Sequence, residues 1–80
     1  MAAISFSPIE DTRISGKFAV VGPRKAEVIL AYSGNDPSMQ HVVFLYENDK
    51  PVRRDDPREY VSRSEAYRIA KQFLKDEAQQ

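Results

Sequence analysis

The sequence predicts an α+β fold: an antiparallel β-meander of three to four strands with one C-terminal helix packed on one face. Two observations lead to this fold class. Residues 62–80 repeat apolar side chains at helical spacing behind a capping signal. Residues 3–53 contain short apolar or alternating runs separated by Gly, Pro, Asn and Asp. A single amphipathic helix needs a flat apolar surface to cover, and the strands provide it.

Length and composition indicate one small globular domain. We expect the 80 residues to form a single domain, residues 1–80. Hydrophobic residues make up 41% and charged residues 30% of the chain, which is typical of a folded protein. The chain has no cysteine, which excludes disulfides and thiolate zinc sites. Its stability must come from the hydrophobic core, a partner or a second copy.

The first three strands follow from alternation and turn residues. Residues 3–9 alternate apolar and small polar side chains, and Pro8 ends this strand or restricts it to an edge. Residues 14–21 form the second expected strand. The turn at 22–25 contains Gly and Pro, and a third strand is expected over 26–33.

A central strand is expected next. The loop at 34–38 is the clearest break in the chain, and residues 40–47 are its most apolar run. A turn at 47–51 and a brief edge pairing at 52–53 follow. Residues 54–59 form a charged connector into the helix.

The helix begins with a capping box, Ser62 to Glu65, which provides partners for two amide groups in the first turn. Val61, just before the cap, is placed to pack against Ala66. The buried stripe is expected to contain Ala66, Ile69, Ala70, Phe73 and Leu74.

Apolar residues occur on both sides of the expected strands, although one helix covers only one face. The sequence leaves open which face the helix covers; one choice is the face with Phe18, Leu30 and Phe44. The opposite face then carries Ala19, Val21, Ile29, Val43 and Leu45. Such a patch on a small domain marks an interaction surface, unless the N-terminal strand or the connector folds over it.

The opposite face is therefore the candidate site for a protein or nucleoprotein partner, or for self-association. Acidic turns beside it offer contacts to basic groups of a partner, although solvated turns have the same composition. The candidate protein-binding residues are Val21, Ile29, Val43, Leu45, Glu47, Asp49, Asp55 and Asp56.

Catalytic motifs are not found in the sequence. The single histidine, His41, begins an apolar strand, and no Gly-x-Ser-x-Gly turn accompanies it. Asp55 and Asp56 are adjacent, so their carboxylates point apart on an extended segment. The acidic residues lack EF-hand spacing and the glycines lack a phosphate-binding pattern. We expect a protein that is not an enzyme and uses no metal or cofactor.

Nucleic-acid binding is the alternative function. The candidate residues are Arg53, Arg54, Arg58, Arg68, Lys71 and Lys75, in the connector and along one helix face. The chain as a whole has 12 basic and 12 acidic residues, so any basic footprint is local.

Two resemblances bear on function. The helix start Ser62-Arg63-Ser64-Glu65-Ala66 resembles that of the sheet-plus-helix DNA-binding modules of phage integrase arms, which read DNA from the sheet; here the sheet offers only Lys17 and Lys25. A short, cysteine-free chain with a small sheet and one helix also resembles phage-encoded anti-CRISPR inhibitors. That group shares no motif, so no residue is carried over.

The second resemblance implies a stoichiometric inhibitor of a nucleic-acid-processing complex such as a CRISPR effector. This is the function we expect first. The N-terminal residues show no secretion signal, and no apolar run approaches the roughly 20 residues that span a bilayer. We therefore expect a cytoplasmic protein without membrane association.

Overall fold

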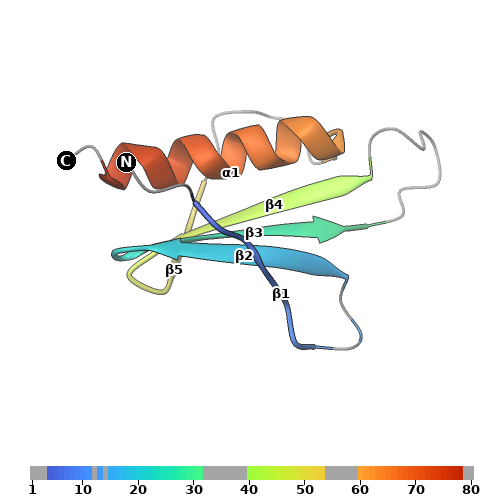
Figure 1. Cartoon of the computed structure of the whole chain (residues 1–80), viewed down its shortest axis with the longest axis horizontal. Coiled ribbons are helices and arrows are strands. Elements are labelled where there is room, and N and C mark those ends of the chain that lie inside the picture. Colours follow the sequence, from blue (N-terminus) through green and yellow to red (C-terminus); the bar gives the residue numbers. More distant parts are fainter. Residues whose placement is uncertain (1–3, 12, 14, 32–39, 54–59, 79–80) are drawn as a thin grey trace.

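The computed structural model describes residues 4–11, 13, 15–31, 40–53 and 60–78. It contains a five-stranded antiparallel sheet and a C-terminal helix, which confirms the α+β fold class (Figure 1). The elements are β1 (Ser7–Pro8), β2 (Gly16–Val21), β3 (Arg24–Leu30), β4 (His41–Glu47), β5 (Lys50–Val52) and α1 (Arg63–Ala78). The strand order β1-β2-β3-β4-β5 is a meander. The expected loop at 34–38 and connector at 54–59 lie outside the described residues.

Tight turns join the longer strands at one end of the sheet. Gly22 has a φ of 58°, and Asn48 and Asp49 have φ values of 53° and 66°. Glycine and Asn-Asp pairs adopt this left-handed backbone most easily, which explains their presence in hairpin turns. The Asn48 amide donates to the Pro23 carbonyl at 2.9 Å, so the two turns are tied together. The first turn is shorter than expected, because Arg24 already belongs to β3.

The strand register decides which side chains share a face. Ala19 pairs with Ala26, and Ala26 pairs with Leu45. All three side chains are buried beneath α1. The expected faces are therefore right for β3 but wrong for β2 and β4. The pairing joins odd-numbered residues of β2 and β4 to even-numbered residues of β3, so Phe18 and Phe44 lie opposite the helix rather than under it.

Val43 and Leu45, expected on the uncovered face, are core residues. Their relative exposures are 3% and 7%. Val21 shares their side of the sheet and packs against the core. Of the four apolar residues proposed as protein-binding, Ile29 alone lies on the face away from α1.

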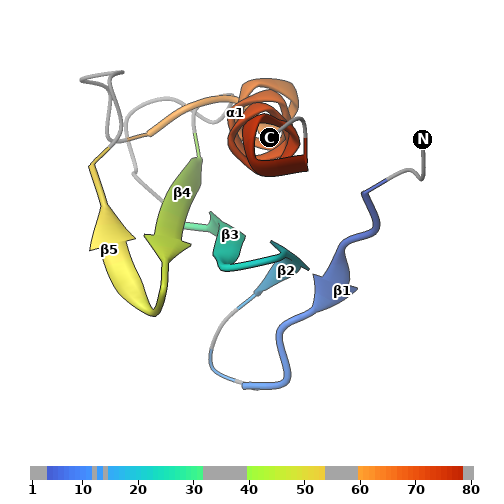
Figure 2. The same cartoon turned by 90° about the vertical axis from the view of Figure 1, so that its left-hand side faces the viewer.

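The core lies between α1 and the middle of the sheet (Figure 2). Ala26, Ala66 and Ala70 are completely buried, and their small side chains allow the helix to approach the strands closely. Leu74, also completely buried, extends this contact toward the C-terminal end of α1. The expected apolar stripe is therefore the buried one, with Ile69 and Phe73 partly buried at its margin.

The start of α1 is fixed by a cap and by a strand contact. The Glu65 amide donates to the Ser62 hydroxyl at 3.3 Å, as the capping signal predicts. Just before the cap, the Val61 amide donates to the His41 carbonyl at 2.8 Å, and the His41 amide donates to the Val61 carbonyl at 3.0 Å. These paired bonds place the first turn of α1 directly beside the start of β4.

Candidate binding surfaces

One side of the sheet is uncovered by any described element (Figure 2). We call it the open face; the register places there Phe18, Val20, Lys25, Glu27, Ile29, Val42, Phe44 and Tyr46. Val20 is 57% and Phe44 44% exposed, and both are large apolar side chains. Apolar residues therefore lie on both sides of the sheet, as predicted, but of the residues expected on the uncovered side only Ile29 is found there.

A polar cluster lies within this apolar face. The Lys25 ammonium lies 5.3 Å from the centre of the Tyr46 ring, within range of a cation–π contact. Burial, and then the charge of Glu27 and a hydrogen bond to it, raise the pKa of Tyr46 above its ordinary value. The open face thus offers one cation and one anion among aromatic side chains.

Of the predicted acidic contacts, Glu47 does not belong to the open face. Glu47 lies on the helix side of the sheet, where its carboxylate accepts a hydrogen bond from Arg24 Nε at 3.0 Å. Asp49 is exposed in the turn between β4 and β5. Asp55 and Asp56 lie outside the described residues.

Arg24 explains the position of Glu47. Its Nη1 donates to the Phe73 carbonyl at 2.9 Å, and its guanidinium lies 4.6 Å from the centre of the Phe73 ring. One side chain therefore connects β3, β4 and the C-terminal half of α1. Glu47 is part of this structural contact.

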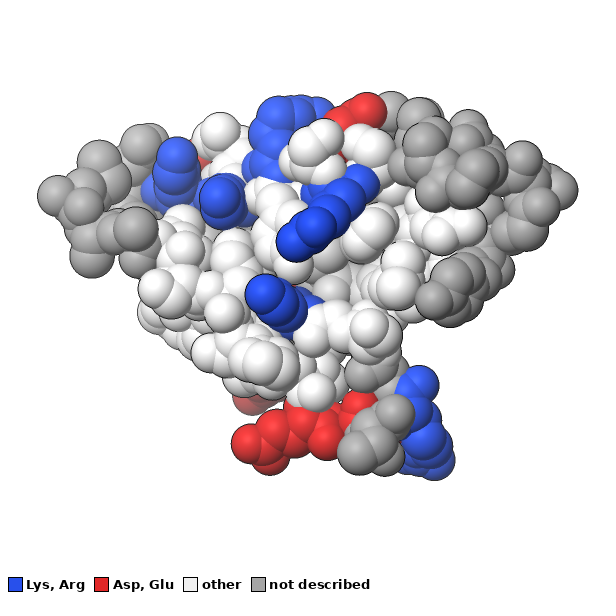
Figure 3. Space-filling view, turned by 45° about the vertical axis from the view of Figure 1, so that its right-hand side comes forward, with Lys and Arg blue, Asp and Glu red and all other residues white. Residues whose placement is uncertain are grey.

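Three cations of the predicted nucleic-acid site lie on one flank of α1. We call Arg68, Lys71 and Lys75 the basic row; all three are exposed. At 100° per residue they fall within an arc of about 60°. Figure 3 shows Lys and Arg gathered over the helix on this side of the molecule. Arg53 is exposed after β5, away from this row, and Arg54 and Arg58 lie outside the described residues.

Acidic residues of α1 lie on a different flank. By the same helical geometry Glu65 and Asp76 point about 100° away from the centre of the basic row. Asp76 accepts a hydrogen bond from Gln72 at 2.8 Å. The basic row therefore contains like charges three and four residues apart, an arrangement that destabilises an isolated helix by a few tenths of a kcal/mol per pair.

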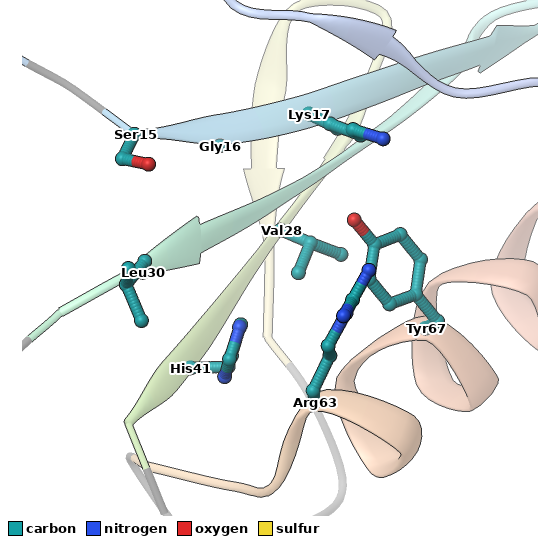
Figure 4. A pocket seen from close by; sticks show the side chains of 8 residues that line it. All are labelled: Ser15, Gly16, Lys17, Val28, Leu30, His41, Arg63 and Tyr67. Carbon is teal, nitrogen blue, oxygen red and sulfur yellow. The ribbon is translucent and has the colours of Figure 1, made fainter.

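A pocket of about 380 Å³ opens between the first turns of α1 and the sheet (Figure 4). We call it the basic pocket; it is lined by Ser15, Gly16, Lys17, Val28, Leu30, His41, Arg63 and Tyr67. Arg63 extends from the helix start alongside the Tyr67 ring, and Lys17 projects from β2 above it. Tyr67 also borders the surface of the basic row, so the pocket and the row are continuous.

His41 forms part of the pocket wall. Burial, and then the positive charge of Arg63, lower the pKa of His41 below its ordinary value of 6.5. Its Nδ1 atom is buried and has no hydrogen-bond partner among the described residues. Its neighbour Arg63 is 22 residues away in sequence and is brought there by the Val61 contact, so no pattern in the sequence indicated this pairing.

Other chemistry has little support in the described part of the chain. No group of three His, Asp or Glu side chains there is placed to hold a metal ion. No described helix is long and apolar enough to cross a membrane. No protein-family model matches the chain, and neither the curated proteins nor the solved structures contain a match.

Proposed function

We propose that this chain is a non-enzymatic binding protein whose open face engages another protein. The observation that supports this is an uncovered sheet face with large exposed side chains, above all Val20 and Phe44. Aromatic residues surrounded by polar groups are typical of the centre of a protein interface. Lys25 and Glu27 give the face a charge pattern that a partner must match.

The face is a better docking surface than the sheet edges. Both edge strands are short, and each contains a proline, Pro8 in β1 and Pro51 in β5. Proline has no amide hydrogen and protects an edge against the addition of another strand. The partner therefore contacts side chains of the open face rather than the backbone of an edge.

More specifically, we propose that the protein is a stoichiometric inhibitor of a nucleic-acid-processing complex, such as a CRISPR effector. Its support is the combination of two surfaces in one small domain. The open face suits a protein surface, and the basic row and basic pocket lie on the helix side, where they suit a nucleic acid held by the same complex.

Affinity capture followed by reconstitution tests the open face. A captured partner is purified, and its affinity and stoichiometry are measured by calorimetry with wild type, Phe44→Lys and Gln72→Lys. Each variant adds one lysine, but Gln72 is exposed on α1, away from the open face. We expect one-to-one binding that falls at least about 10-fold for Phe44→Lys and is unchanged for Gln72→Lys. Equal binding of both variants overturns the proposal.

A small nucleic-acid-binding module is the second candidate, favoured by the segregated cations of the basic row. Anisotropy of a labelled oligonucleotide at low and moderate salt tests it, because phosphate contacts make affinity fall steeply with salt. Lys71→Gln and Lys50→Gln each remove one positive charge, the first from the basic row and the second from the exposed β5 strand. Only Lys71→Gln is expected to weaken binding, and an equal effect of both would indicate non-specific attraction.

A further inference from the structure

The basic pocket collects like charges from both layers of the fold. Lys17 comes from β2 and Arg63 from the start of α1; the hydroxyl group of Tyr67 lies between their side chains, and His41 lines another part of the pocket wall. None of the described lining residues is acidic. Positive groups converging on one hollow repel each other, and an anion in the hollow removes that repulsion.

The fold fixes the backbone at the helix start and the Tyr67 ring. The paired backbone bonds between Val61 and His41 fix the helix start against β4, and therefore fix the backbone from which Arg63 extends. Tyr67 packs edge-on against Phe6, with ring centres 5.1 Å apart. A site whose walls are fixed before binding loses less entropy when a ligand enters.

The donors suit a phosphate group in particular. A guanidinium presents two parallel N–H groups to phosphate oxygens, and an ammonium adds a compact charge. The hydroxyl group of Tyr67 provides a further donor beside both cations.

We propose that the basic pocket binds a phosphate group between Lys17 and Arg63, and that this phosphate belongs to a single-stranded nucleic acid whose neighbouring phosphates contact the basic row. The inference rests on the second candidate function. It names the basic pocket as the place where one phosphate of the nucleic acid is held. Tyr67 lines both the pocket and the surface that contains Lys71 and Lys75, so a phosphate bound in the pocket lies beside the basic row. Inorganic phosphate and mononucleotides share the same chemistry and are the other source of such a group.

The test compares charge-neutralising variants inside and outside the pocket. Arg63→Gln and Lys17→Gln remove one cation each from the pocket, and Lys50→Gln removes one from the exposed β5 strand. All three residues are exposed, so folding is expected to persist and is checked by circular dichroism. Binding of a labelled single-stranded oligonucleotide is measured over a salt series, and inorganic phosphate is followed by NMR shifts of the Arg63 and His41 signals.

We expect Arg63→Gln and Lys17→Gln each to weaken oligonucleotide binding about 10-fold and to reduce the salt slope by about 1, with no such change for Lys50→Gln. If the oligonucleotide binds wild type and both pocket variants equally, the pocket proposal is overturned while the second candidate function stands. If inorganic phosphate shifts these signals but the oligonucleotide does not bind, the pocket is a phosphate site and the nucleic-acid function is wrong. If neither binds, both are wrong.

Discussion

Gly16 shows how one residue fixes the spacing of two strands. A Cβ atom at this position would lie 2.5 Å from the Val28 carbonyl oxygen, closer than any real contact allows. Glycine in a strand often marks such a close backbone approach. The sequence contains this glycine within an alternating run, but only the pairing with Ile29 explains why no side chain fits there.

Gly16→Ala is therefore expected to destabilise the protein by about 1–3 kcal/mol, because β2 and β3 must move apart. Urea unfolding measures the effect. Ser15→Ala, a change at the neighbouring exposed residue, is the control and is expected to change stability by less than about 0.5 kcal/mol. A Gly16→Ala protein as stable as wild type would show that the strands are not held this close.

His41 makes stability depend on pH. Because burial and Arg63 lower its pKa in the folded state, the unfolded chain takes up a proton more readily as the pH falls below the ordinary value of 6.5. Arg63 and Lys17 face the same pocket and stay positive through this range, and no described lining carboxylate offsets them. Stability contributed by neutral His41 is thus present above pH 6.5 and is lost as the pH falls through its lower folded pKa.

We expect wild type to lose more stability than His41→Gln when the pH is lowered from about 7.5 to about 5. Urea unfolding at both pH values gives the loss of stability of each protein. The carboxylates are the same in both proteins, so their contribution to the pH dependence cancels when the two losses are compared. An equal loss in both proteins would contradict the assignment of this pH dependence to His41.

At the level of elements, the helix was the part most completely predicted from the sequence. The capping signal at Ser62 and the apolar spacing of α1 are local patterns, and both are present in the structure. The faces of β2 and β4 were wrong because strand register depends on how strands pair, which alternation within one strand does not determine. The edge strands β1 and β5 are short and gave weak signals.

Ser62→Ala tests the cap at this scale. Loss of the hydroxyl group leaves the Glu65 amide without this acceptor, and we expect a loss of about 1 kcal/mol in unfolding free energy. Ser15→Ala, at an exposed position outside the helix, is the control and is expected to have a smaller effect. A Ser62→Ala protein as stable as the control would show that the cap contributes nothing.

At the level of the whole molecule, the large exposed apolar side chains of the open face and the gathered cations of the helix side lie on opposite sides of the sheet. The chain has no net charge, yet the basic row and basic pocket gather cations on the helix side. The spacing of Lys71 and Lys75 predicted the row, because it lies within one helix. Lys17 and Arg63 were not predicted to meet, since their proximity depends on the packing of two distant segments.

The measurement that tests the central claim most directly is urea unfolding of Val43→Lys and Phe44→Lys. These adjacent residues of β4 point to opposite faces; Val43 is 3% exposed and Phe44 44%. If the open face is free for a partner, Val43→Lys loses more than about 4 kcal/mol or unfolds, while Phe44→Lys loses about 1 kcal/mol or less. Equal, large losses would show that the open face is part of the core and would contradict its role as a binding surface.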